Sequence, residues 1–258
     1  MDFTALPFWL YPVLFFTGLV AGFVDSIAGG GGLITIPVLL NIGLPPELAL
    51  GTNKLQATFG SGSATWHFAR ARLIDWRSAR LGVVFTLIGS LVGTSLVRLL
   101  PSSVLREVIP WLLIGISLYM ILQPRLGSEK RAARMQEDGF YITFGLAIGF
   151  YDGFFGPGTG TFWAMAFMLV LGFEMTRATA HTKLMNFTSN VASLAVFMAG
   201  GHCHLAGGFS MGLGQLIGAR LGSKAVIRKG VGFIRPVFVT VAILITLRLL
   251  WQNFGAAR

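Results

Sequence analysis

GLVAGFVDSIAGGGG, residues 18–32, returns later in the chain as GLAIGFYDGFFGPGTG, residues 145–160. Both copies place an aspartate, Asp25 or Asp152, just before a glycine cluster that interrupts an apolar segment. Glycine is a poor helix former, because it loses more backbone freedom on folding than other residues. The repeated stretch therefore predicts two broken helices, one in each half of a duplicated chain.

The composition around this stretch is that of an integral membrane protein. The chain has 258 residues, of which 54% are hydrophobic and only 12% charged, and its mean hydropathy is +0.72. A soluble domain has roughly 25% charged residues. Residues 7–24, 81–97 and 184–201 carry no charge, and each stretch is near the roughly 17–25 residues that cross a bilayer. The first of them lacks a basic leader, so we expect it to be retained rather than cleaved. We predict an all-α polytopic membrane protein.

The duplication extends through both halves of the chain. GTNKLQ, residues 51–56, corresponds to HTKLMN at 181–186, and LIGSLVG at 87–93 corresponds to LIGARLG at 216–222. Each half is predicted to hold five membrane-embedded helical segments, and the second segment of each is a short half-helix or re-entrant arm. The segments are 8–28, 33–43, 48–69, 79–98 and 107–123, then 139–155, 160–172, 178–200, 205–222 and 233–252. The predicted domains are a first repeat at 1–123, a charged linker at 124–138 and a second repeat at 139–258.

The net charge of +10 is concentrated in loops. Of the 20 Lys and Arg residues, 12 fall in residues 70–80, 124–138 and 224–235. Cytoplasmic loops of membrane proteins carry this excess. A nucleic-acid partner is disfavoured, because no aromatic and basic residues interleave as a binding surface would need.

Loop charge also predicts that the two repeats are inverted. The loop at 70–80 is rich in arginine, whereas its counterpart at 200–208 has no Lys or Arg. Equivalent loops therefore face opposite sides, with the 124–138 linker cytoplasmic and both termini periplasmic. Arg98 and Arg106 fit the outer side poorly. Inverted repeats with broken helices are a recurring transporter architecture, with the substrate site near the midplane.

Lys54 and Lys183 are the candidate centre of a substrate site, because an ionisable group within the membrane is costly and needs a partner. The glycine breaks precede them, and the N–H groups at the start of a helix favour an anion. The backbone groups considered for this role belong to Gly31, Gly32, Gly158 and Gly160. A tight hairpin, in which glycine only permits close packing, is the alternative.

Polar residues continue from each lysine along one helical face, at spacings of three and four. Hydroxyls and amides can donate to anionic oxygens, so we predict a substrate pathway, with adhesion between helices or a snorkelling lysine as the alternative. The candidate residues beside the lysines are Asn53, Gln56, Thr58, Ser61 and Thr65 in the first half, and Thr182, Asn186, Asn190 and Ser193 in the second.

Asp25, Asp152 and His181 are the candidates for proton coupling. The two aspartates are the matched carboxylates of the repeats, and His181 neighbours Lys183. Histidine titrates near neutral pH. The aspartates could equally hold the N–H groups of the broken backbone or pair with the lysines, and His181 could be a core donor.

Metal and enzymatic chemistry are not expected. His202, Cys203 and His204 are adjacent on a short loop, where three neighbours rarely converge on one ion. No nucleophile–base constellation stands out, so neither a metal, a cofactor nor an enzyme activity is predicted.

These features resemble the sulfite exporter TauE/SafE family of bacterial membrane permeases. The resemblance rests on the paired glycine-break segments, on GTNKLQ with its partner HTKLMN and on the charged linker, and it covers about residues 10–252. It implies a multi-pass carrier in the bacterial inner membrane, and members are linked to sulfite, sulfonates and other sulfur-containing or organic anions. The halves differ in HTK against TNK and in GPGTG against GGGG, so the two half-sites are not equivalent.

The sequence therefore favours a secondary transporter that exports a small anion by alternating access, with protons as candidate coupling ions. The alternatives are a carrier for another substrate class such as a metal cation, and a membrane scaffold or intramembrane enzyme. A homodimer is left open.

Overall fold

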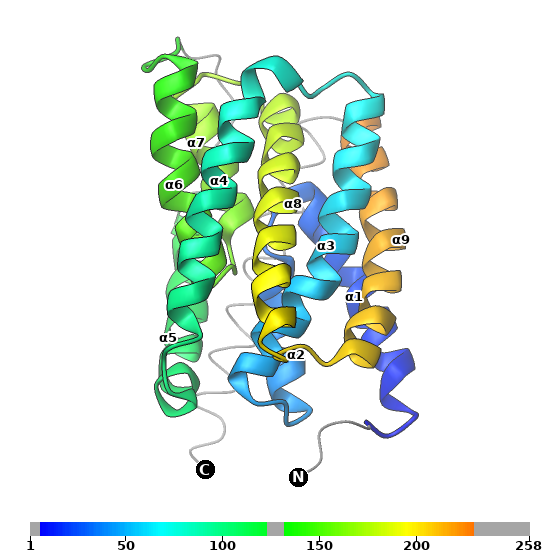
Figure 1. The fold of residues 1–258 in the computed structure, drawn as a ribbon. Coiled ribbons are helices and arrows are strands. Elements are labelled where there is room, and N and C mark those ends of the chain that lie inside the picture. The colour runs from blue at the N-terminus through cyan, green and yellow to red at the C-terminus, as the bar shows by residue number, and fades with distance from the viewer. Residues whose placement is uncertain (1–5, 123–131, 230–258) are drawn as a thin grey trace.

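The computed structural model describes residues 6–122 and 132–229, and these residues form an upright bundle of helices (Figure 1). The described helices are α1 (Leu10–Ala28), α2 (Gly31–Asn41), α3 (Pro46–Arg70), α4 (Trp76–Val97), α5 (Ser102–Leu122), α6 (Glu137–Phe154), α7 (Thr159–Leu169), α8 (Met175–Ala199) and α9 (Leu205–Lys229).

Nine of the ten predicted segments correspond to these helices, and most boundaries agree within a few residues. The predicted end of the ninth segment at residue 222 is wrong, because α9 continues to Lys229. Its last turn carries Arg228 and Lys229, whose charges complement the negative end of the helix dipole. The predicted segment at 233–252 and most of the 124–138 linker lie outside the described residues.

The two halves are interleaved rather than side by side. Two long helices, α3 and α8, pack against each other at the centre, α1 packs along α9, and α6 packs along α4 (Figure 1). Each of these outer pairs joins the first helix of one half to the fourth helix of the other. Glycine allows this close approach, because a methyl group at Gly218 would collide with the Leu19 carbonyl and one at Gly153 with the Ser90 carbonyl.

The distribution of side chains suits a lipid environment. Large apolar side chains are exposed along α4 and α9, whereas the buried polar side chains concentrate on the central helices α3 and α8. Within the described residues, α1 over Leu10–Ile27 and α4 over Trp76–Val97 are long and apolar enough to cross a membrane. The central helices are 25 residues each, long enough to span, and their polar faces lie inside the bundle.

The two glycine breaks produce the predicted short helices. Gly30 before α2 and Gly158 before α7 adopt left-handed conformations, with φ of 95° and 80°. The breaks meet, since a methyl group at Gly29 would lie 2.9 Å from the Cα of Gly160. In Figure 1, α2 and α7 extend toward opposite ends of the bundle.

Equivalent loops also lie at opposite ends of the bundle. The α3–α4 connection is at the top of the view in Figure 1, and the α8–α9 connection is at the bottom. Arg98, which fits an outer loop poorly by charge, has a local role. Its guanidinium donates to the Val196 carbonyl at 2.9 Å, near the C-terminus of α8, where a cation is favourable.

Candidate functional site

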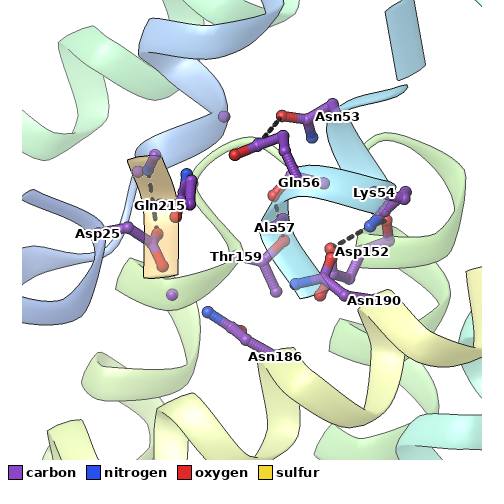
Figure 2. A pocket seen from close by; sticks show the side chains of 16 residues that line it. Asp25, Asn53, Lys54, Gln56, Ala57, Asp152, Thr159, Asn186, Asn190 and Gln215 are labelled. Atoms are coloured by element: carbon purple, nitrogen blue, oxygen red, sulfur yellow. Dashed lines mark hydrogen bonds and ion pairs between the residues drawn. The ribbon is translucent and has the colours of Figure 1, made fainter. Parts of the chain in front are cut away.

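A small polar cavity lies where the two broken helices meet the central pair (Figure 2). Its volume is about 30 Å³, which is room for roughly two water molecules. Its lining comes from α1, α3, α6, α8, α9 and both glycine breaks. The lining residues are Asp25, Gly30, Gly31, Gly32, Asn53, Lys54, Gln56, Ala57, Asp152, Gly156, Gly158, Thr159, Gly160, Asn186, Asn190 and Gln215.

Two buried ion pairs cross between the halves at this cavity. Lys54 Nζ lies 2.6 Å from Asp152 Oδ1, and Lys183 Nζ lies 2.9 Å from Asp25 Oδ2. Each pair joins a lysine of one repeat to the aspartate of the other. The lysine side chains are 2% and 1% exposed. Since an unpaired buried charge costs several kcal/mol, each aspartate stabilises the lysine that it faces.

The two aspartates have different second partners. Asp25 accepts a hydrogen bond from the Gly31 N–H at 3.0 Å, at the start of α2, the position where an anion would be favoured. Asp152 instead accepts from the Ser189 hydroxyl, and its own backbone carbonyl accepts from Lys54 Nζ at 2.5 Å. The Asp25 side chain is 20% exposed against 5% for Asp152. The half-sites are therefore not equivalent, and Asp25 is the more accessible carboxylate.

Amide side chains form the rest of the polar surface. Asn53 Oδ1 accepts from the Thr35 hydroxyl at 2.6 Å and from Gln56 Nε2 at 2.8 Å, which fixes the Asn53 amide. Gln56 Oε1 and Asn186 Oδ1 are buried and have no hydrogen-bond partner among the described residues. A buried polar atom without a partner carries a desolvation cost, so these two groups suit water or a ligand in the cavity.

The predicted site residues separate into those that line the cavity and those that lie outside its lining. Thr58 and Ser61 donate back to the Lys54 and Ala57 carbonyls within α3, and Ser61 also accepts from Asn190 Nδ2 at 3.3 Å. Thr182 is buried, and its hydroxyl has no hydrogen-bond partner within residues 6–122 and 132–229. Lys183 lies just behind the lining, near Gly160. Thr65 and Ser193 are buried and also lie outside the lining. The other predicted anion-site residues all contribute to the lining, as do Asp25 and Asp152.

His181 faces a different part of the molecule. Its Nε2 accepts from the Asp75 backbone N–H at 3.3 Å, and its Nδ1 lies 3.0 Å from the Tyr141 hydroxyl. The ring also makes edge contacts with Phe167 and Phe173. The structure therefore places this candidate in an aromatic cluster and outside the cavity lining.

Sequence reasoning missed several lining residues, of which Gln215 is the most polar. It lies on α9 and is 2% exposed. The signal available was a lone amide among the glycines of the uncharged first part of α9, residues 205–219. Thr159 was also missed, and its hydroxyl donates to the Gly156 carbonyl and tightens the second break.

The histidine loop acts on backbone rather than on a metal. His204 Nδ1 accepts from the Gly207 N–H at 3.0 Å in the first turn of α9, and the His204 N–H donates to the Thr52 hydroxyl at 2.9 Å. Among the residues described by the structure, no three His, Cys, Asp or Glu side chains are grouped to hold a metal ion.

The outer helices expose apolar side chains, and they surround a buried polar site at two helix breaks. These features define a multi-pass membrane transporter. Comparison with known proteins agrees with this class. The family model "Sulfite exporter TauE/SafE" matches residues 14–249, and the chain belongs to this family. The resemblance read from the sequence is thereby confirmed. This is a family of transporters and not of enzymes, and membership places the protein in the cytoplasmic membrane.

Curated relatives carry transporter names without a substrate. "Probable membrane transporter protein YfcA" of Escherichia coli (strain K12) is 47% identical over 246 residues, 95% of this chain and 91% of the relative. A "Probable membrane transporter protein" of Haemophilus influenzae is 44% identical over 248 residues, 95% of this chain and 96% of that one. The more distant YunE of Bacillus subtilis is 25% identical over 268 residues, 94% of this chain and 98% of the relative. No solved structure gives a significant match.

Proposed function

We propose that this protein is a secondary transporter that exports a small anion, such as sulfite, a sulfonate or another sulfur-containing or organic anion, by alternating access. The observation that carries the proposal is the pair of buried lysines, each held by an aspartate of the opposite repeat, at a polar cavity between two helix breaks. Ammonium groups, amides and helix N-termini are all hydrogen-bond donors that suit oxyanions.

The ion pairs suggest how the anion is bound. An oxyanion is larger than the roughly two water molecules that the cavity of about 30 Å³ holds, so side chains must move when it enters. The Asp25 carboxylate already accepts from the Gly31 N–H and from Lys183, as a bound anion would. The substrate oxyanion would replace an aspartate as the partner of its lysine.

Proton coupling is compatible with this exchange of partners between the aspartate and the anion. When the anion takes over Lys54 or Lys183, the displaced carboxylate loses its cation and is stabilised by taking up a proton. Asp25 and Asp152 line the cavity and are therefore the favoured proton carriers. Asp25→Asn and Asp152→Asn should remove the pH dependence of net flux while anion exchange continues, and His181→Gln tests the third candidate. A pH dependence that survives all three changes would show that transport is not proton-linked.

Inverted repeats are the architecture that we propose for alternating access. The α3–α4 and α8–α9 connections lie at opposite ends of the bundle, and the basic 70–80 loop would face the cytoplasm. Single cysteines placed at 70–80 and at 200–208, in a Cys203→Ser background, should react with an impermeant thiol reagent from opposite sides. Equal labelling from one side would contradict the inversion.

The outward direction is supported by membrane energetics. An inside-negative potential drives anions out, with about 2.3 kcal/mol per charge for each 100 mV. A metal cation as substrate is disfavoured, because both acidic side chains among the described lining residues already pair with lysines. A site for a hard metal cation needs several oxygen ligands that are free to bind.

Flux measurements on purified, reconstituted protein test the proposal. Proteoliposomes loaded with sulfite, sulfate, thiosulfate, methanesulfonate or acetate should release at least one of these anions faster than empty liposomes. Lys54→Ala and Lys183→Ala should abolish or strongly weaken this release, whereas Lys224→Ala, at an exposed lysine of α9, should not. Unchanged flux in both cavity variants would refute the lysine site.

A further inference from the structure

The cavity has one end beside Asp152 and another beside Asp25, and we call these ends its two poles (Figure 2). The poles differ at three pairs of residues that correspond in the internal repeat. Gln56 on α3 corresponds to Met185 on α8, and Gly60 corresponds to Ser189, by the register that aligns Lys54 with Lys183. On the outer helices, the residue before each LIG motif is Thr86 on α4 and Gln215 on α9, and these two form the third pair.

At the pole beside Asp152, the three residues pack against protein groups and leave no polar atom for a ligand. Thr86 Oγ1 contacts Met185 Sδ at 3.5 Å, and Ser189 donates to Asp152. Thr86, Met185 and Ser189 are buried, and none of them lines the cavity. The polar groups of this pole are therefore used within the protein.

At the other pole the equivalent residues leave the site polar and open. Because residue 60 is a glycine, Gln215 can lie against it, and a methyl group there would collide with Gln215 Oε1. A Cβ at Gly22 on α1 would also lie 3.0 Å from this oxygen. Gln215 Nε2 donates to no residue in the part of the chain that the structure describes, although the side chain is 2% exposed and lines the cavity. In Figure 2, Gln215 lies on the Asp25 side of the cavity, away from Lys54 and Asp152.

We propose that Gln215 is an anion-binding residue that makes this pole the single substrate position of the cavity. Its amide nitrogen donates to an oxygen of the transported oxyanion, and the neighbouring Asn186 amide, which also lines the cavity, adds a second donor. The Thr86 pole offers no equivalent group, so the repeat does not produce a second site. This inference rests on the proposed anion transport and specifies where the anion lies.

The test compares Gln215→Met with Thr86→Val in reconstituted protein. Methionine keeps the length of glutamine and removes the amide, and valine removes the hydroxyl at the equivalent position of the other pole. The measurements are initial rates against concentration for sulfite, thiosulfate and methanesulfonate, and the rise in thermal unfolding midpoint that each anion produces in detergent.

The half-saturation concentration of the transported anion should rise at least about tenfold in Gln215→Met, because a hydrogen bond to a charged group is lost. Its maximal rate should change little, its unfolding midpoint without anion should match the wild type, and the stabilisation by anion should shrink. Thr86→Val should keep the wild-type half-saturation. If Gln215→Met transports the anion with the wild-type half-saturation concentration, the role of Gln215 is overturned, whereas the proposed anion transport stands.

Two further outcomes separate this inference from the proposed function. If wild-type protein transports and binds none of the five anions used in the flux measurements, the proposed function fails and the inference fails with it. If Gln215→Met is not recovered as a monodisperse folded protein, Gln215→Glu decides, because it keeps the shape and adds a negative charge. Anion affinity should then be lost, and wild-type half-saturation in Gln215→Glu would overturn the proposal.

Discussion

The Lys54–Asp152 pair predicts a specific pattern of stability in a double-mutant cycle. The variants are Lys54→Met, Asp152→Asn and the combination of both, with Lys224→Met as an exposed control. Lys54 is 2% exposed and Asp152 5%, and Lys54 Nζ contacts both the Asp152 carboxylate at 2.6 Å and its backbone carbonyl at 2.5 Å.

Removing one partner leaves an uncompensated buried charge, which costs about 3–5 kcal/mol. The destabilisation by Lys54→Met should lie near the lower end of this range, since Asp152 keeps its hydrogen bond from the Ser189 hydroxyl and can take up a proton. Replacing both residues removes both charges and should cost about 1 kcal/mol or less relative to the wild type. The double variant should therefore be more stable than either single one, and the exposed control should fall within about 0.5 kcal/mol of wild type.

Unfolding in mixed detergent micelles, followed by the fluorescence of the chain's six tryptophans, measures these differences. The non-additive energy of the cycle isolates the pair. If the two single effects simply add in the double variant, or if Lys54→Met costs less than about 1 kcal/mol, the buried ion pair does not stabilise the fold as argued.

Three further predictions concern transport, packing and pH. Lys183→Arg should not restore the flux that Lys183→Ala loses, because a planar guanidinium does not replace a compact ammonium where the side chain is only 1% exposed. Wild-type flux in the arginine variant would contradict this. Gly218→Leu should prevent α9 from packing on α1 through a collision with the Leu19 carbonyl, and recovery of wild-type amounts of folded protein would show that the contact is adjustable. Asp75→Ala should cost about 1 kcal/mol, since the Asp75 carboxylate caps two N–H groups of α4. Those hydrogen bonds lower the pKa of Asp75, so its stabilisation is present at neutral pH and is lost as pH falls through the lowered value. Wild-type and Asp75→Ala unfolding midpoints should converge at low pH, and a constant difference would exclude this cap.

The helices could be predicted because their signals are local. The glycine clusters, the charged loops and the uninterrupted apolar runs each mark a boundary within a few residues. The sequence analysis ends this helix too early because the apolar run stops at Gly222, whereas the helical backbone continues through a segment that carries Lys224, Arg228 and Lys229. Hydropathy reports the environment of a segment, and hydrogen bonding within the backbone decides where the helix ends.

The site could be predicted only in part, because its final geometry depends on contacts between distant helices. Repeat matching identified Lys54 and Asp152, but no local pattern shows that each lysine pairs with the aspartate of the other half. His181 was a candidate through its nearness to Lys183 in sequence. Residues two apart on a helix point about 200° apart, which accounts for its position in the aromatic cluster. Gln215 has no periodic polar partner on α9, so only the folded chain brings it to the cavity.

The crossed pairs also constrain how an anion and a proton could be coupled. Each buried lysine is neutralised by an aspartate, so the two ion pairs together carry no net charge. An anion that takes over one lysine leaves one negative charge in excess, and a carboxylate left unpaired at this depth would cost several kcal/mol. Uptake of one proton by that aspartate restores neutrality. The electrostatics therefore favour one proton for each negative charge that the substrate brings. Under this mechanism a divalent anion would need both aspartates, and its uptake would depend on pH more steeply than that of a monovalent anion.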